Sequence, residues 1–268
     1  MNTEGAIALD LWHVALAGLL VLVAGVVSVA LGLKLEKPLA VASVRCLVQL
    51  LLIGYLLGWV FRIHSPLVLF PVLLVMIGVA SHAATDRSAR IYRGVHWHAF
   101  LTLALTGLVT TFLVTGAVIG VQPWYRAQYV VPLLGMILGN SLTGLSLCLD
   151  QLLETVHERR AEVEMELALG ATRWEAARGP LAASVRRGMI PTINAMMVVG
   201  IVSLPGMMTG QILAGADPAV AVRYQIVVMF MLTASTALGC IFIALLACRT
   251  LFNDRHQLVS RLLIHRKK

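Results

Sequence analysis

The sequence predicts an all-α polytopic membrane protein with about seven transmembrane helices, an N-terminus outside the membrane and a cytoplasmic C-terminus. Composition is the first observation: 59% of the 268 residues are hydrophobic and only 13% are charged, with a mean hydropathy of +0.87. Soluble domains carry about 25% charged residues. The second observation is a series of apolar runs long enough to cross a bilayer, and the third is the one-sided distribution of the basic residues.

The apolar runs divide the chain into spans that are separated by polar or basic loops. A bilayer core needs about 20 apolar residues per helix. The segment before the first run contains no Lys or Arg, so it lacks the basic region of a secretory signal, and we expect the first run to stay in the membrane. The predicted spans are residues 11–33, 38–61, 66–83, 98–120, 128–149, 189–210 and 224–248.

The Lys and Arg residues predict the orientation of these spans. Of the 21 residues, 17 follow spans one, three, five and seven, three lie in loops on the other side, and Arg45 lies within span two. Basic loops of membrane proteins stay in the cytoplasm. The net charge of +8 is thus spread over several cytoplasmic segments, which argues against a nucleic-acid surface. We expect a multi-pass protein of the bacterial inner membrane.

The one sizeable polar segment is residues 150–188. Apolar residues at helical spacing predict a charged helix up to Leu169, and Gly170 suits the left-handed residue that ends it. Thr172 and Glu175 match the capping box that opens a second helix. A proline in the interior of a helix usually ends or kinks it, so Gly179-Pro180 predicts that this second helix has only about two turns.

This short second helix would carry Trp174 on the cytoplasmic surface. A short helix with an exposed aromatic residue is the element with which an ATP-driven transporter docks its ATPase. The alternative interpretation of residues 150–188 is a solvated charged loop that has no partner. The sequence contains no G-x-x-x-x-G-K-[ST] phosphate-binding motif, so ATP hydrolysis is expected in a separate subunit and no cofactor is expected here.

Several stretches resemble one family of ABC-transporter membrane subunits. The sequence EMELALG, from Glu164 to Gly170, is similar to their E-A-A-x-x-x-G loop, with Met165-Glu166 in place of both alanines. Residues 190–215 (IPTINAMMVVGIVSLPGMMTGQILAG) and 224–230 (YQIVVMF) resemble the FetB family of permeases, of the UPF0014 type. The stretches GMILGNSLTG and VRCLVQLLLIGYLL agree with this family, so the resemblance covers nearly the whole chain.

The resemblance implies the function and the partners. The family includes proteins assigned to bacterial iron export and plant aluminium-tolerance membrane subunits, which work with a separately encoded ABC ATPase. It therefore implies a single transmembrane permease domain over residues 1–268, with residues 150–188 as its coupling segment. Because seven spans make a thin pathway and an ABC pump has two ATPases, we expect a homodimer of the permease. The residues predicted to couple it to the ATPase are Glu164, Gly170, Thr172, Trp174 and Glu175.

Polar residues within the spans are candidates for the pathway. Arg45 and Gln49 lie four residues apart on one face of span two. Arg45 either faces a cavity and contacts an anionic substrate, or extends its guanidinium to the headgroups. Asn140 in span five and Asn194 in span six offer amide groups, which more often join helices than bind a substrate.

Span six contains a predicted break. Pro205-Gly206 should interrupt the helix and free backbone carbonyls, which is tolerated at membrane depth only where protein or a water-filled cavity covers them. Met207 and Met208 follow the break and either fill gaps in the core or offer thioethers to a soft metal. The eight histidines form no recognisable metal motif, and the four cysteines lie in apolar runs, which is typical of small core residues. The metal-binding residues are therefore not predicted.

Other classes of function remain open at this point. An ABC permease for an organic solute, such as a sugar nucleotide or a lipid, would suit Arg45 and the lack of acidic residues within the spans. A stand-alone secondary transporter should carry acidic or histidine residues at mid-membrane, which this sequence lacks. No Ser/His/Asp, Cys/His or paired-carboxylate set predicts catalysis, so we do not expect an enzyme.

Overall fold

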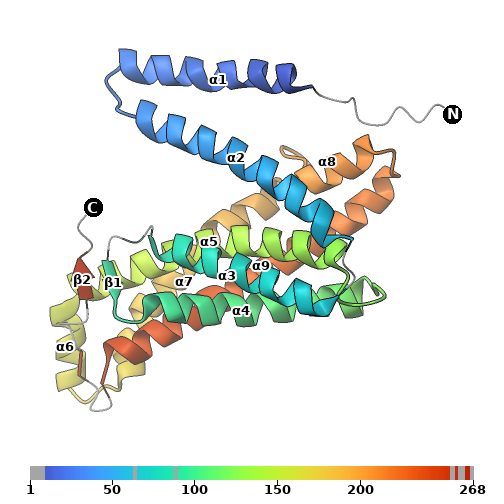
Figure 1. The fold of residues 1–268 in the computed structure, drawn as a ribbon. Coiled ribbons are helices and arrows are strands. Elements are labelled where there is room, and N and C mark those ends of the chain that lie inside the picture. The colour runs from blue at the N-terminus through green and yellow to red at the C-terminus, as the bar shows by residue number, and fades with distance from the viewer. Residues whose placement is uncertain are drawn as a thin grey trace. The chain divides into compact units, whose positions relative to one another are not determined.

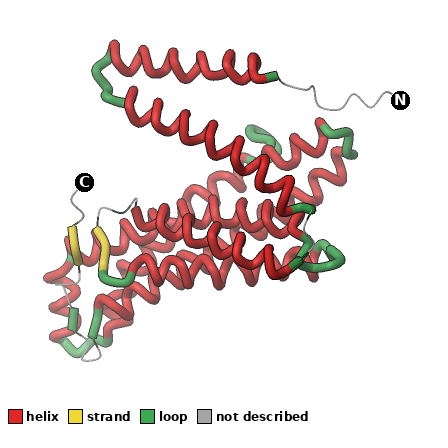
Figure 2. The backbone as a smooth tube through the Cα atoms, viewed as in Figure 1, coloured by secondary structure: helices red, strands yellow, loops and turns green. Residues whose placement is uncertain are grey.

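The computed structural model describes residues 10–62, 65–86, 88, 90–253, 257–258 and 263–265. Several residues of the basic pattern lie outside the described residues, namely Arg87, Arg255, Arg261, Arg266, Lys267 and Lys268. The elements are α1 (Leu11–Ala30), α2 (Glu36–Val60), α3 (Pro66–Asp86), β1 (Arg90–Tyr92), α4 (Val95–Leu113) with a π-helical end η1 (Val114–Val118), α5 (Ala127–Glu158), α6 (Arg160–Ala168), α7 (Arg173–Val198), α8 (Gly206–Leu213), α9 (Pro218–Leu251) and β2 (Leu263–His265). Figure 2 shows that helices dominate, with one short two-stranded ribbon.

The chain forms two compact units. The first, which we call the hairpin unit, comprises residues 1–64 and 210–217, and the second, the bundle unit, comprises residues 65–209 and 218–268. Helix α8 begins in the bundle unit and ends in the hairpin unit. The expectation that residues 1–268 act as one permease domain concerns function, and it stays a prediction.

Helices α1 and α2 form the antiparallel hairpin after which the first unit is named. The turn between them is held by Ser28, whose hydroxyl donates to Glu36 Oε2 at 3.3 Å and accepts from the backbone N–H of Leu35 at 2.9 Å. Most apolar side chains of both helices are exposed. Helices that are apolar all round suit a bilayer, where lipid covers them.

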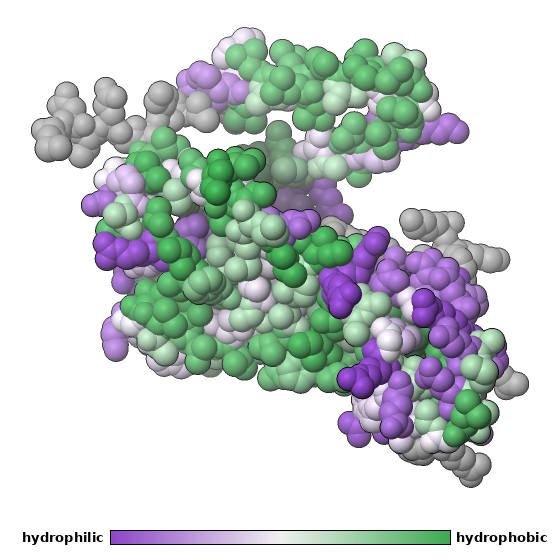
Figure 3. All heavy atoms as spheres, turned by 180° about the vertical axis from the view of Figure 1, so that it is seen from behind, coloured by the Kyte–Doolittle hydropathy of each residue, from purple (hydrophilic) through white to green (hydrophobic). Residues whose placement is uncertain are grey.

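The core of the bundle unit is formed by α5, α7 and α9, and α3 and α4 pack against α5 and α9 (Figure 1). Helix α7 buries a row of small residues, listed as Ala176, Ala177, Pro180, Ser184, Gly188 and Thr192. Small residues let helix backbones approach closely, which is how helices associate in membranes. A Cβ atom added to Gly188 would lie 2.7 Å from the carbonyl oxygen of Gly144 in α5. In Figure 3, hydrophobic side chains cover the flank of this bundle, and hydrophilic ones gather at the end that carries α6.

The structure confirms a helical polytopic membrane protein. Among the described residues, six helices are long and apolar enough to span a membrane: α1, α2, α3, α4 with η1, α5 and α9. The predicted sixth span, residues 189–210, does not form one helix, because α7 ends at Val198 and α8 begins at Gly206. A seventh crossing and the predicted orientation of the termini remain predictions.

The predicted end of the second helix at Gly179-Pro180 is wrong. Helix α7 runs without interruption from Arg173 to Val198 with Pro180 and Pro191 inside it. Proline removes one backbone hydrogen bond, but neighbouring helices stabilise such positions in membrane bundles. Pro180 is buried in the small-residue face of α7, so tertiary packing overrides the local preference for a helix end.

The predicted break in span six is present, and it is longer than the sequence suggested. Helix α7 ends at Val198, several residues before Pro205. The backbone then turns back on itself: Val202 N–H donates to Val198 O at 2.9 Å, and Gly200 N–H donates to Ser203 O at 2.9 Å. Gly200 has a φ of +83°, a left-handed conformation that favours glycine. The break therefore covers residues 199–205.

Candidate functional site

The coupling segment turns sharply at Gly170, as predicted. Gly170 has a φ of +94°, and its N–H donates to Leu167 O at 3.1 Å. The N–H of Ala171 donates to Glu166 O, also at 3.1 Å. These two bonds form the Schellman motif, in which a left-handed residue satisfies the last carbonyl groups of a helix. Gly170 thus ends α6 and sets the direction of the chain that enters α7.

The predicted capping box is also present at the start of α7. The Thr172 hydroxyl accepts from Glu175 N–H at 3.4 Å, and Glu175 Oε2 accepts from Thr172 N–H at 2.7 Å. The Thr172 hydroxyl also donates to Glu175 Oε2 at 2.7 Å. Both residues lie on the surface, so they fix the first turn of α7 through local bonds. Their bonds hold the turn that presents Trp174, and their role in coupling stays a prediction.

Glu164 has a basic partner within its own helix. Its Oε1 accepts from Arg160 Nε at 2.8 Å, four residues earlier on α6. Both side chains are about half exposed, so the pair contributes little to stability. It does leave a defined charge pair on the outer face of α6, where a partner could contact it.

Three large apolar side chains are exposed at α6, at its C-terminal end and at the start of α7. Met165 is 58% exposed, Leu169 81% and Trp174 40%, and the guanidinium of Arg173 lies 5.5 Å from the ring centroid of Trp174. We call Met165, Leu169 and Trp174 the coupling surface. Contiguous apolar patches among polar residues mark protein contacts, and we expect these three side chains to form such a contact. Trp174 was predicted from the sequence, whereas Met165 and Leu169 were not, although their i, i+4 spacing places them on one helix face.

Helix α7 connects this surface to the core of the bundle. Its 26 residues correspond to a rise of about 39 Å. At its middle, Gly188 lies against Gly144 and Cys148 of α5 and Cys240 of α9. At its far end, the Thr233 hydroxyl of α9 donates to the sulfur of Met196 at 2.8 Å. A displacement at the coupling surface would therefore be carried by one continuous helix to the break at residues 199–205.

A polar cluster lies between α3 and α4. Thr85 Oγ1 lies 2.7 Å from His96 Nδ1, and the Tyr92 hydroxyl lies 2.9 Å from His98 Nδ1. Ser88 Oγ donates to Asp150 Oδ1 of α5 at 3.2 Å, which joins this loop to the start of the coupling segment. Burial raises the pKa of the Tyr92 hydroxyl well above its usual range, so it stays neutral.

The described residues contain no group of three or more His, Cys, Asp or Glu side chains that could hold a metal ion. Cys148, Cys240 and Cys248 are buried free thiols, as expected of core residues, whereas Cys46 is exposed on α2 and does not fit that expectation. The thiol of Cys148 lies 3.6 Å from the carbonyl oxygen of Cys240, at the α5–α9 contact. In the part of the chain that the structure describes, the bundle core thus offers thiols and hydroxyls for packing, and no set of acidic or histidine ligands.

The candidate pathway residues fall into separate places. Arg45 and Gln49 are both exposed on α2 of the hairpin unit. Asn140 is exposed on α5, where its amide donates to Met136 O at 3.1 Å, and Asn194 is exposed on α7. The close contact of Gly144 with Gly188 puts α5 and α7 in register so that Asn140 and Asn194 lie at about the same level of the bundle.

The residues after the break lie partly inside the bundle. Pro205 and Gly206 form the junction between the break and α8. Met207 packs against the cluster formed by Val114, Leu133, Ile137, Val228, Met231 and Leu232. Met208 is half-buried. The packing of Met207 favours the gap-filling role of these methionines over the metal-binding one.

A stripe of buried threonines on α4 was not recognised in the sequence. Thr102, Thr106 and Thr110 recur every four residues, and the hydroxyls of the last two donate to the carbonyl groups one turn earlier, at 2.8 and 2.6 Å. A Cβ atom on Gly239 of α9 would lie 3.8 Å from Thr106 Oγ1, so this stripe faces α9. The i, i+4 spacing of the threonines was the available signal.

The chain also matches a family of known proteins. The chain matches the model described as "Uncharacterised protein family (UPF0014)" over residues 11–252. It is 36% identical to the UPF0014 membrane protein YjkA of Bacillus subtilis over 93% of this chain and 98% of the relative. It is 34% identical to the "Probable iron export permease protein FetB" of Escherichia coli, over 91% and 93%. It is 31% identical to "Protein ALUMINUM SENSITIVE 3" of Arabidopsis thaliana, over 91% and 88%.

No solved structure is a significant match to the chain. The resemblance inferred from the sequence is confirmed, and two of these relatives are named as a membrane protein and a permease protein. Together with the apolar helices, they show a multi-pass protein of the bacterial inner membrane. Since the family model and these relatives match nearly the whole chain, it belongs to the UPF0014 family.

Proposed function

We propose that this protein is the transmembrane subunit of an ATP-driven ABC transporter that exports iron, another metal ion or a metal complex. The coupling surface at the start of α7 is the observation that carries the proposal. It presents three exposed apolar side chains outside the apolar helices, on a turn that a Schellman motif and a capping box hold in place. The partner is a separate ABC ATPase, which would supply the hydrolysis site that this chain's sequence lacks.

The coupling mechanism follows from the continuity of α7. The ATPase contacts Met165, Leu169 and Trp174, and the Arg160–Glu164 pair lies beside the contact. When the ATPase moves, it pulls on the first turn of α7 beyond the Gly170 turn. The close packing at Gly188 makes α5 and α9 move with α7. The break at residues 199–205 then changes shape, because it is the irregular segment at the end of the moving helix.

We further propose that two copies form the pathway, with a cytoplasmic C-terminus in each. Asn140 and Asn194 are exposed on a bundle whose other exposed side chains are mainly apolar. A side-chain amide has more donors and acceptors than its own helix satisfies, even in Asn140, which donates to Met136 O, so a second copy or a water-filled path is expected to cover these groups. Residues 199–205 would border the same path as its gate.

The assignment of a metal rests on the relatives, one of which is named a probable iron export permease. An organic anion is the second candidate substrate. It is favoured by Arg45, an exposed cation within an apolar helix, and by the lack of an acidic or histidine ligand group among the described residues. A metal that travels as an anionic complex would satisfy both observations.

The experiment is transport into inside-out vesicles that contain the permease and its ATPase. We expect ATP-dependent uptake of radioactive iron, which Trp174→Ala abolishes and vanadate inhibits. Citrate-bound iron and free ferrous iron are compared, because only the complex carries the anionic groups that Arg45 would contact. If uptake of iron, copper and aluminium is the same with and without ATP, the metal-export proposal is wrong, and ATP-driven uptake of an organic anion would establish the second candidate.

A further inference from the structure

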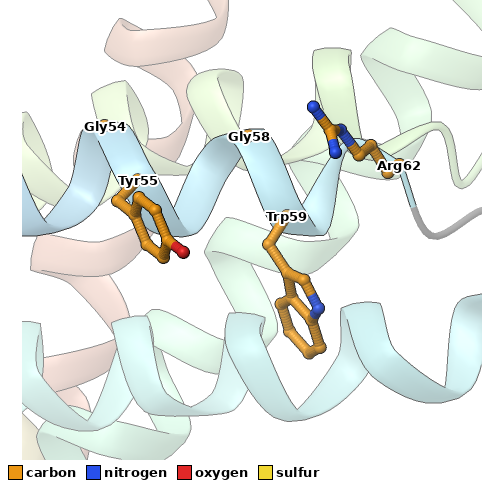
Figure 4. A pocket seen from close by; sticks show the side chains of 5 residues that line it. All are labelled: Gly54, Tyr55, Gly58, Trp59 and Arg62. Carbon is orange, nitrogen blue, oxygen red and sulfur yellow. The ribbon is translucent and has the colours of Figure 1, made fainter.

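A hollow lies on the surface of α2, near the C-terminal end of this helix. It has a volume of about 300 Å³ and is lined by Gly54, Tyr55, Gly58, Trp59 and Arg62, which all lie at the C-terminal end of this apolar helix and just beyond it. In Figure 4, Tyr55 and Trp59 extend from the same side of the helix one turn apart, and Arg62 lies at its end. The lining is therefore apolar along the helix and cationic where the helix ends.

Packing within the hairpin unit does not explain the two glycines. A Cβ atom on Gly54 or Gly58 would meet nothing within 4 Å, whereas one on Gly144 or Gly188 of the bundle would collide with a neighbouring helix. Glycine weakens the interior of a helix relative to alanine. Two glycines one turn apart keep a strip of the α2 backbone bare within the hairpin unit.

The charge at the end of the hollow indicates what the occupant is. Arg62 is exposed, and its guanidinium has no hydrogen-bond or ion-pair partner among the residues that the structure describes. An arginine at the end of a membrane span lies at the depth of the phosphate groups, and its planar guanidinium matches a phosphate with two parallel hydrogen bonds. Trp59 is 52% exposed, and tryptophan prefers this interface.

We propose that this hollow binds one anionic phospholipid. Its acyl chain lies against the bare backbone at Gly54 and Gly58. Its phosphate is held by Arg62, on the same side of the helix as the glycines in Figure 4. The site is independent of the proposed transport activity, since it contains none of the coupling or pathway residues.

A second copy of α2 fits the same hollow less well. A pair of glycines four residues apart is a common crossing point of two membrane helices. Arg62 lies one turn beyond Gly58, about 6 Å of helix rise, so a symmetric pair would bring two guanidinium groups of like charge close together. Two such like charges repel each other. A phosphate neutralises the same charge, and this complementarity favours the lipid.

The proposal can be tested by native mass spectrometry of the full-length permease, with titration of phosphatidylglycerol and of phosphatidylcholine. We expect the wild-type protein to bind one phosphatidylglycerol about fivefold more tightly than phosphatidylcholine, the preference that a single basic residue near a phosphate produces. Arg62→Gln should remove this preference. Arg223→Gln, a matched loss of one exposed positive charge, should leave it unchanged.

The acyl-chain half of the site is tested separately with the double variant Gly54→Leu and Gly58→Leu. Its added side chains fill the bare strip, so it should weaken the binding of both lipids. If this variant does not fold, Arg62→Gln alone decides the question. Equal lipid preference in Arg62→Gln and wild type would overturn the proposal, as would an equal loss in Arg223→Gln. Oxidative cross-linking of a Gly54→Cys variant into dimers, made stronger by Arg62→Gln, would show that the occupant is a second copy and would also overturn it.

Discussion

Replacing Gly188 with alanine should separate α7 from the core of the bundle. The added Cβ would lie 2.7 Å from the carbonyl oxygen of Gly144, 2.8 Å from Cys240 Sγ and 2.9 Å from Cys148 Cβ. Ordinary contact begins at 3.4 Å, so α7 or α5 must move by about 0.7 Å, the difference between 3.4 and 2.7 Å. The nearest obstacle is backbone, which no side-chain rotation can relieve.

Overpacking of this kind costs about 1–3 kcal/mol, and we expect the upper end because three atoms collide at once. The assay is thermal unfolding of the purified permease in detergent, followed by the fluorescence of a thiol-reactive dye at the buried cysteines. Gly188→Ala should lower the midpoint temperature of thermal unfolding by several degrees. It should also reduce coupling between ATP hydrolysis and transport, because the helix that joins the two would no longer be held against α5 and α9.

The matched control is Gly179→Ala in the same helix. A Cβ atom there meets nothing within 4 Å, and alanine favours a helix interior by up to about 1 kcal/mol over glycine. This variant should be as stable as the wild type or more stable. A Gly188→Ala protein with the melting midpoint of Gly179→Ala would refute the reasoning that close α5–α7 packing holds the coupling helix in place.

Four further predictions concern the coupling segment and the pathway. Gly170→Val forces a β-branched residue to a φ of +94°, at a cost of about 1–2 kcal/mol, and should lower co-purification of the ATPase, whereas Gly179→Val in the same assay should not. Trp174→Ala should weaken ATPase binding by about 2 kcal/mol or more, measured by pull-down at several ATPase concentrations; unchanged binding would move the docking site to the loop between α3 and α4. Gly200→Val, at a φ of +83°, should abolish transport in a folded, ATPase-bound protein, and full transport would show that the break is incidental. Arg45→Ala should impair transport while Arg45→Lys retains part of it if the charge alone matters; wild-type transport in Arg45→Ala would leave contact with headgroups as the role of this residue.

Much of the architecture could be predicted from local patterns. Apolar length located the helices that can cross a membrane, because a bilayer imposes that length directly. Gly170 and the Thr172–Glu175 pair were predicted correctly, since helix ends are satisfied by bonds between residues two to five apart in sequence. Met165 and Leu169 were missed because apolar spacing alone does not tell which face of a short helix stays exposed.

The sequence by itself determined a helical membrane protein, its family and the two ends of the coupling turn, because composition, motifs and local hydrogen bonds depend on neighbouring residues only. The tertiary structure alone decided that α7 continues through Gly179-Pro180, since Pro180 is stabilised by the helices around it and not by its own segment. The tertiary structure also decided where the break begins, because the turn at Val198 is closed by backbone hydrogen bonds that no single residue type predicts. The role of Gly188 likewise depends on α5 and α9, which approach it from 44 residues earlier and 52 residues later in the chain, at Gly144 and Cys240. Contacts between such distant segments leave no pattern in the local sequence, and only the packed bundle shows them.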